Sequence, residues 1–167
     1  MKKDEQPTTL AGDDPFIAVY NNTGQTFNTT SLSISNPHNR DTDFPVNSPV
    51  VSGSSVYVTW IEEPSNTRES DAFIAISNDS GQTFNTTRLS KLDPGTRANN
   101  IINNPVVSGD NIYVTWREDK YNHSPFLQNA FIAVSNDNGA SFKTEGLSIF
   151  GQESLGNVRS IGNPVVP

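Results

Sequence analysis

The sequence predicts an all-β protein built from repeated four-stranded antiparallel sheets. Three observations predict this class: apolar segments that recur at a nearly fixed spacing, short runs of β-branched and aromatic residues, and turn-forming residues between those runs. No window has a sustained period of 3.6 residues, so no helix is expected.

One segment occurs three times in the chain. It reads FIAVYNNTGQTF from Phe16, FIAISNDSGQTF from Phe73 and FIAVSNDNGASF from Phe131, at offsets of 57 and 58 residues. Each copy has two apolar pieces separated by Asn, Asp, Ser or Gly, of which Asn, Asp and Gly tolerate the positive φ that hairpins need. We therefore expect the two pieces of each copy to pair as antiparallel strands.

A second segment alternates with the first. It reads NSPVVSG from Asn47 and NNPVVSG from Asn103, and NPVV recurs from Asn163. The two complete copies are followed by VYVTW from Val56 and IYVTW from Ile112. Because a short Gly-containing turn separates PVV from the next run, we expect a second hairpin. Each repeat unit then has four antiparallel strands in chain order.

The strand interiors alternate poorly between apolar and polar residues, as in Phe73–Ile76, which predicts burial on both faces of the sheet. Repeated four-stranded sheets covered on both faces are typical of β-propeller blades. The alternative is a two-layer β-sandwich made from duplicated hairpins. The expected organisation is a flexible segment 1–15 followed by a partial blade 16–34, blades 47–90 and 103–147, and the start of another blade at 161–167.

Composition excludes several classes of function. The chain has 11 basic and 18 acidic residues, so its net charge of -7 argues against nucleic-acid binding. It has no cysteine, which excludes disulfides and thiolate sites, and its two histidines are isolated, so neither a cofactor nor a metal is expected. No apolar run approaches the roughly 20 residues that a membrane span needs.

Two turns resemble the Asp-box, or BNR repeat, of sialidase-like propellers. In this family the last position of the box is usually Trp, whereas all three copies here have Phe, and the first copy also lacks the Ser and the Asp. The matching positions are Ser77, Asp79, Gly81, Thr83 and Phe84, then Ser135, Asp137, Gly139, Ser141 and Phe142, and in the first copy Tyr20, Asn22, Gly24, Thr26 and Phe27.

The chemistry of the box predicts a structural role. The Asp79 carboxylate can accept hydrogen bonds from backbone N–H groups of its own turn, and the Thr83 hydroxyl can close the loop. Gly81 can adopt a conformation that a Cβ would strain, and Phe84 can anchor the turn in the core. The resemblance also implies that the boxes lie on the face opposite the active site, so we expect Asp79 and Asp137 to be structural.

The resemblance implies what a catalytic site would need. Sialidases of this family use three arginines for the substrate carboxylate, a Tyr and Glu nucleophile pair, an acid/base Asp and an Arg-Ile-Pro motif, which this chain lacks. The candidates are Arg97, in the link between the two complete blades, and Arg159, which precede Pro105 and Pro164 by 8 and 5 residues, together with Tyr121 and Glu118. The alternative is that all four are ordinary residues of charged surface connections.

Five acceptor sequons N-x-(S/T) predict surface glycosylation if the protein is secreted. They begin at Asn21, Asn28, Asn78, Asn85 and Asn122. No apolar signal segment follows Met1. The richness in Asn and Thr, the acidity and the family resemblance favour an extracellular or cell-surface location.

Two complete and two partial blades are fewer than the about four to eight that usually close a propeller, so we expect additional blades or a homo-oligomer. The expected function is that of a non-catalytic extracellular module that binds a glycan or a protein through its charged connections. The alternatives are a sialidase-like glycoside hydrolase of the exo-α-sialidase type, of which this is a partial propeller, and a purely structural repeat.

Overall fold

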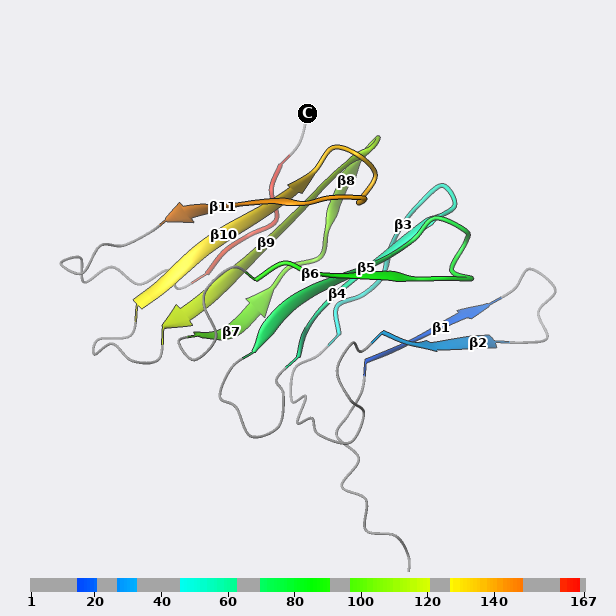
Figure 1. Ribbon diagram of the computed structural model, residues 1–167, viewed down its shortest axis with the longest axis horizontal. Coiled ribbons are helices and arrows are strands. Elements are labelled where there is room, and N and C mark those ends of the chain that lie inside the picture. The colour runs from blue at the N-terminus through cyan, green and yellow to red at the C-terminus, as the bar shows by residue number, and fades with distance from the viewer. Residues whose placement is uncertain are drawn as a thin grey trace, which may run out of the picture.

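The computed structural model describes residues 15–20, 27–32, 46–62, 70–90, 97–120, 127–148 and 160–165. Within these ranges the chain forms eleven β-strands and no helix. All of their pairings are antiparallel, so the all-β class is confirmed. The strands form three sheets, which follow one another across the molecule in chain order (Figure 1).

Sheet 2, the middle one, has the four strands that the sequence predicts. Each strand pairs with its neighbour in the chain, and Tyr57 lies opposite Val50 on one side and Ile76 on the other. The PVV and VYVTW pieces therefore pair with each other. The strands are β3 (Val50–Ser52), β4 (Ser55–Glu62), β5 (Asp71–Ser77) and β6 (Asn85–Arg88).

Sheet 3 repeats this order and adds a fifth strand, β7, in the segment between the two repeat units, where the sequence predicts a link rather than a strand. Strand β9 is ten residues long and β8 only three, so the rest of the β9 edge has backbone groups that need partners, and β7 pairs with them. The strands are β7 (Arg97–Ile102), β8 (Val106–Ser108), β9 (Asn111–Lys120), β10 (Leu127–Ser135) and β11 (Lys143–Ser148).

Sheet 1 consists of β1 (Phe16–Tyr20) and β2 (Phe27–Ser31). These two strands are the repeat counterparts of β5 and β6. Ile17 lies opposite Thr30 in sheet 1, just as the counterpart positions lie opposite each other in sheet 2.

Sheet 2 lies between the other two sheets, and both of its interfaces use the same repeat positions. All seven residues that are buried where sheets 1 and 2 meet have buried counterparts 56 to 58 residues later, where sheets 2 and 3 meet. The first set is Ile17, Leu32, Val56, Val58, Trp60, Phe73 and Ala75. The second set is Ile74, Leu89, Ile112, Val114, Trp116, Phe131 and Ala133. Burial on both faces, as predicted, is therefore confirmed for sheet 2.

An Asn–Thr bridge joins sheet 2 to sheet 3. The Asn47 Nδ2 group donates to the Thr59 hydroxyl at 2.9 Å and to the Ile102 carbonyl at 2.9 Å. The Thr59 hydroxyl donates in turn to the Asn103 carbonyl at 3.0 Å. Asn47, which precedes β3, and Thr59 of β4 thus hold the segment through which the chain enters β8 of the next sheet.

The same bridge recurs one repeat later. Asn103 Nδ2 donates to the Thr115 hydroxyl at 2.8 Å and to the Ile161 carbonyl at 2.9 Å, and the Thr115 hydroxyl donates to the Gly162 carbonyl at 3.0 Å. Ile161 and Gly162 therefore contact sheet 3 in the same way as Ile102 and Asn103, which lead into β8, contact sheet 2. The same set of hydrogen bonds therefore joins sheet 2 to the entry of β8 and joins sheet 3 to residues 160–165.

A second pair of contacts repeats at the outer strands. The Thr86 hydroxyl of β6 donates a long hydrogen bond of 3.4 Å to the Leu32 carbonyl, and the Thr144 hydroxyl of β11 donates one of 3.5 Å to the Leu89 carbonyl. Successive sheets are thus tied at both their inner and their outer strands.

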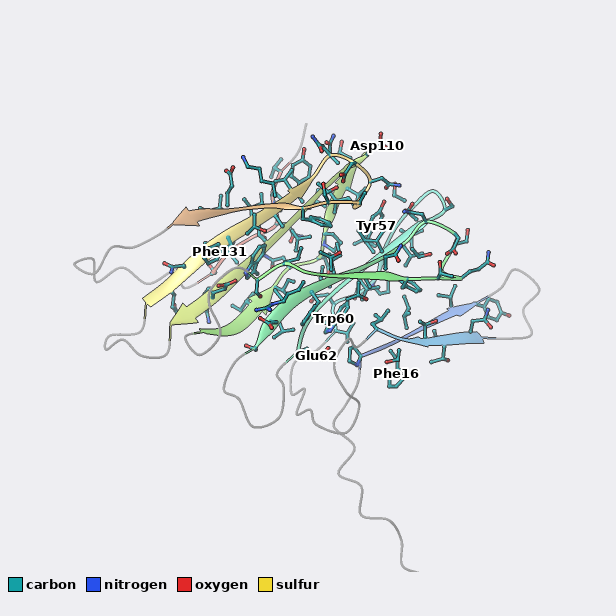
Figure 2. All side chains as sticks on the ribbon, viewed as in Figure 1. Phe16, Tyr57, Trp60, Glu62, Asp110 and Phe131 are labelled. Atoms are coloured by element: carbon teal, nitrogen blue, oxygen red, sulfur yellow. The ribbon has the colours of Figure 1, made fainter. Side chains whose placement is uncertain are left out.

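The two ends of the sheets differ. The β3–β4, β5–β6, β8–β9 and β10–β11 connections lie together at one end, here called the turn end (Figure 1). The chain leaves β4 and β9 and enters β5 and β10 at the opposite end, here called the connection end. Asp110 lies at the turn end and Glu62 at the connection end (Figure 2).

The β5–β6 connection is longer than the sequence predicts. Thr83 and Phe84 were expected to begin the fourth strand, but β6 begins at Asn85, and Ser141 and Phe142 likewise precede β11. The strand starts later because these residues are part of the turn itself.

Candidate functional site

The Asp79 carboxylate organises the β5–β6 connection. Its Oδ1 accepts from the Ser77 hydroxyl at 2.7 Å and from the backbone N–H groups of Gln82 and Thr83 at 3.0 and 2.9 Å. Its Oδ2 accepts from the Thr83 hydroxyl at 2.6 Å. The Ser77 oxygen also accepts from the Gly81 N–H at 2.7 Å. We call this arrangement, in residues Ser77–Phe84 and Ser135–Phe142, the acidic corner.

The corner at Asp137 repeats most of these contacts. Its Oδ1 accepts from the Ser135 hydroxyl at 2.7 Å and from the Ser141 N–H at 2.9 Å, and its Oδ2 accepts from the Ser141 hydroxyl at 2.6 Å. The Gly139 N–H donates to the Ser135 oxygen at 2.8 Å. Serine thus replaces threonine in the second corner without loss of this contact.

These hydrogen bonds hold both corner carboxylates in the charged form. The hydroxyl of Thr83, followed by its N–H and by Ser77, lowers the pKa of Asp79 from 3.8 to about 2. The hydroxyl of Ser141, followed by Ser135 and the Ser141 N–H, lowers the pKa of Asp137 to about 2. Asp79 accepts four hydrogen bonds from its own turn, three on Oδ1 and one on Oδ2. This arrangement suits a turn-stabilising residue rather than a catalytic or metal-binding one.

The corner glycines contact the preceding sheet. Gly81 has φ of +84°, and a Cβ placed on it would lie 2.6 Å from a methyl carbon of Val19 in β1. Gly139 has φ of +85°, and a Cβ there would collide with the δ-methyl of Ile76 in β5. Glycine is therefore required both by the backbone conformation and by the close approach of a neighbouring sheet.

A polar network connects the two corners at the turn end. The Asn138 amide nitrogen donates to the Asn78 Oδ1 at 3.3 Å, and the Asn78 Oδ1 also accepts from the Ser55 hydroxyl at 3.0 Å. The Tyr57 hydroxyl donates to the Asn138 Oδ1 at 3.3 Å. Adjacent sheets are thus linked through exposed as well as buried groups.

A buried glutamate lies at the connection end of each larger sheet. The Trp60 indole N–H donates to Glu62 at 3.2 Å, and the Trp116 indole N–H donates to Glu118 at 2.7 Å. Both carboxylates are almost fully buried, at 1% and 0% exposure. The contact recurs in both sheets, so it is a structural feature of the repeat unit. Glu118 is buried and bonded to Trp116, which does not suit an exposed nucleophile.

Each of these indoles also stacks on a phenylalanine of the next strand. The ring centroids of Trp60 and Phe73 lie 5.5 Å apart and those of Trp116 and Phe131 lie 5.7 Å apart, at interplanar angles of 18° and 17°. The sequence contains a signal for the buried glutamates, because VYVTW-x-E from Val56 recurs as IYVTW-x-E from Ile112.

The other candidates are only partly placed. Arg97 begins β7, where its backbone lies opposite Lys120 of β9, and Asn99 lies opposite Glu118. The other two candidates, Tyr121 and Arg159, lie outside the described residues. The connection end also has an ion pair, in which Arg88 lies 3.1 Å from Asp71.

Three sequons fall on exposed asparagines of the described chain: Asn28, Asn78 and Asn85. Asn28 and Asn85 hold the same position in β2 and β6, opposite Val19 and Ile76. Asn21 and Asn122, and the corner residues Asn22, Gly24 and Thr26 of the first copy, lie outside the described residues.

The described residues contain no group of three or more His, Cys, Asp or Glu side chains arranged to hold a metal ion. They also contain no helix that is long and apolar enough to cross a membrane. No protein-family model matches the chain, and a search of curated proteins gives no match.

Proposed function

We propose that the three sheets are successive blades of a β-propeller and that the acidic corners are Asp-boxes. The observation that supports this most strongly is the repeated interface: the same apolar positions and the same Asn–Thr bridge relate each repeat to the next. A constant relation between successive sheets is what arrangement around one axis requires. A two-layer sandwich instead places two sheets face to face, and it does not explain a middle sheet that is buried on both sides.

For the activity, we propose a non-catalytic extracellular module that binds a glycan or a protein at the connection end. The corner carboxylates are occupied by their own turns, and Glu118 is buried against Trp116. The connection end has charged residues on adjacent strands, with Arg97 opposite Lys120 and Arg88 beside Asp71. Charged groups at the end of a rigid scaffold suit recognition of a polar or acidic ligand.

A glycan array probed with the whole chain tests this proposal. We expect binding to acidic glycans without turnover, weakened by Arg97→Ala and by Lys120→Ala and unchanged by Gln82→Ala at the turn end. Removal of a charged hydrogen bond to a ligand costs about 1.5 to 3 kcal/mol, which is a roughly tenfold to hundredfold loss of affinity. Equal weakening by Gln82→Ala would place the site elsewhere.

The second candidate is a sialidase-like hydrolase, which is favoured by the position of Arg97 in the chain at the connection end, opposite Lys120 of β9. Arginine is the residue type that binds a carboxylate through two parallel hydrogen bonds. Hydrolysis of a fluorogenic sialoside that is lost in Arg97→Ala would replace the binding proposal with this one. The absence of both binding and hydrolysis would leave the purely structural repeat.

A further inference from the structure

A leucine that is buried in two sheets is exposed in the third. Leu32 and Leu89 follow the last strands of sheets 1 and 2 and are each 2% exposed, because the next sheet covers them. Their counterpart in sheet 3 is Leu147, which is 57% exposed. Leu147 lies at a bulge in the β10–β11 pairing, between Gly146 and Ser148, and no further described sheet covers it.

The rest of this face of sheet 3 shows the same change. Ile74 and Ile76 of β5 are 0% and 4% exposed between sheets 2 and 3. Their counterparts in β10, Ile132 and Val134, are only partly buried. We call Ile132, Val134 and Leu147 the tail face. Their counterparts pack against the next sheet at the interface of sheets 1 and 2 and at that of sheets 2 and 3, whereas no described sheet packs against the tail face.

The opposite half is uncovered at the other end of the molecule. Phe16 is 56% exposed and Ala18 is exposed, whereas their counterparts Phe73 and Ala75 are 6% and 0% exposed. Phe16 lies on the side of sheet 1 that points away from the other sheets (Figure 2). We call Phe16 and Ala18 the head face.

Within the chain, the Ile and Leu side of one sheet always packs against the Phe and Ala side of the next. We propose that two copies of this chain associate head to tail, with the tail face of one copy against the head face of the other. Such an interface is heterologous, because each copy contributes a different surface. The two internal interfaces support it, because in both of them these same residue types pack together.

This association is weaker than the packing within the chain. In sheet 1 the structure describes the counterparts of β5 and β6, and the head face therefore lacks a described tryptophan equivalent to Trp60 and Trp116. Less apolar area is buried than at the internal interfaces, so association depends on protein concentration. The proposal concerns the ends of the row of sheets, and it does not rest on any ligand at the connection end.

Sedimentation velocity of the whole chain over a range of concentrations tests the proposal. We expect the weight-average mass of the wild-type protein to rise with concentration and that of Phe16→Asp or Leu147→Asp to remain monomeric. Both side chains are more than half exposed, so neither variant should lower the melting temperature of the monomer. Ser52→Asp, which adds the same charge at the exposed end of β3, is the matched control and should associate like the wild-type protein.

Mixing the two blocked variants gives the sharpest result. Phe16→Asp keeps an intact tail face and Leu147→Asp keeps an intact head face, so the mixture should form one-to-one pairs while each variant alone does not. A wild-type protein that is monomeric at every concentration would overturn the proposal and leave the faces to another occupant. A pair that survives Phe16→Asp but not Leu147→Asp would also overturn it, because two tail faces would then meet symmetrically.

Discussion

Single residues of the acidic corner have two functions at once. Ser77, Asp79 and Thr83 satisfy the backbone of their own turn, while Gly81 lets the turn approach Val19 of the preceding sheet. The spacing of these residues predicts the hydrogen bonds, because all of the partners lie within four residues. It does not predict the contact with Val19, which depends on how the sheets pack.

The charge of Asp79 makes a pH-dependent contribution to stability. Its pKa is lowered from 3.8 to about 2 in the folded protein, so the stabilisation is fully present above pH 3.8 and is lost as the pH falls towards 2. We expect Asp79→Asn to lower the melting temperature at neutral pH, and the difference from the wild-type protein to close over that interval. Thermal unfolding monitored by circular dichroism measures it. A difference that stays constant down to pH 2 would show that the carboxylate charge is not what matters.

The corner glycines should tolerate substitution less well than the hairpin glycines. Gly53 and Gly109 have φ of +60° and +59° with open space around them, so replacement by alanine should cost about 1 to 2 kcal/mol from the backbone alone. At Gly81 and Gly139 the clash with the preceding sheet adds about 1 to 3 kcal/mol. Urea denaturation of Gly81→Ala and Gly53→Ala gives the comparison. Equal losses of stability would mean that the close approach of the sheets does not occur.

Among the strands, the sequence predicts the four that each complete unit shares, and the structure has them in the predicted order. It does not predict β7, because Arg97–Ile102 has a composition weak in strand formers and becomes a strand only where the long β9 offers a free edge. It also misplaces the start of β6, since Thr83 bonds to Asp79 instead of joining the ladder. Both errors arise from tertiary contacts that local patterns do not contain.

The Asn–Thr bridge is expected to couple neighbouring strands and sheets. Asn103→Ala removes two hydrogen bonds, one to Thr115 and one to the Ile161 carbonyl, and should cost about 1 to 3 kcal/mol. Asn104→Ala, at the adjacent position, is the control. A double-mutant cycle of Asn103→Ala with Thr115→Val should give a non-zero coupling energy in urea denaturation. Additive effects would show that these side chains do not interact.

At the scale of the whole molecule, the period of 57 or 58 residues predicts repeated units, but their mode of packing becomes visible only in three dimensions. Seven apolar positions and two sets of side-chain hydrogen bonds recur between successive sheets. The buried contacts of Glu62 and Glu118 with the indoles could be found in the sequence only once the repeat units are aligned with each other. The exposed faces of sheets 1 and 3 follow from the same repetition.

The central claim is that the two inter-sheet interfaces have the same packing. Proton–proton nuclear Overhauser effects in the whole chain test it most directly. We predict cross-peaks between the Gly81 α-protons and the Val19 methyl groups, and between the Gly139 α-protons and the Ile76 δ-methyl group. Detection of both pairs would establish that each acidic corner contacts the preceding sheet in the same way. Absence of either pair, with the corner turns otherwise intact, would contradict the repeated packing.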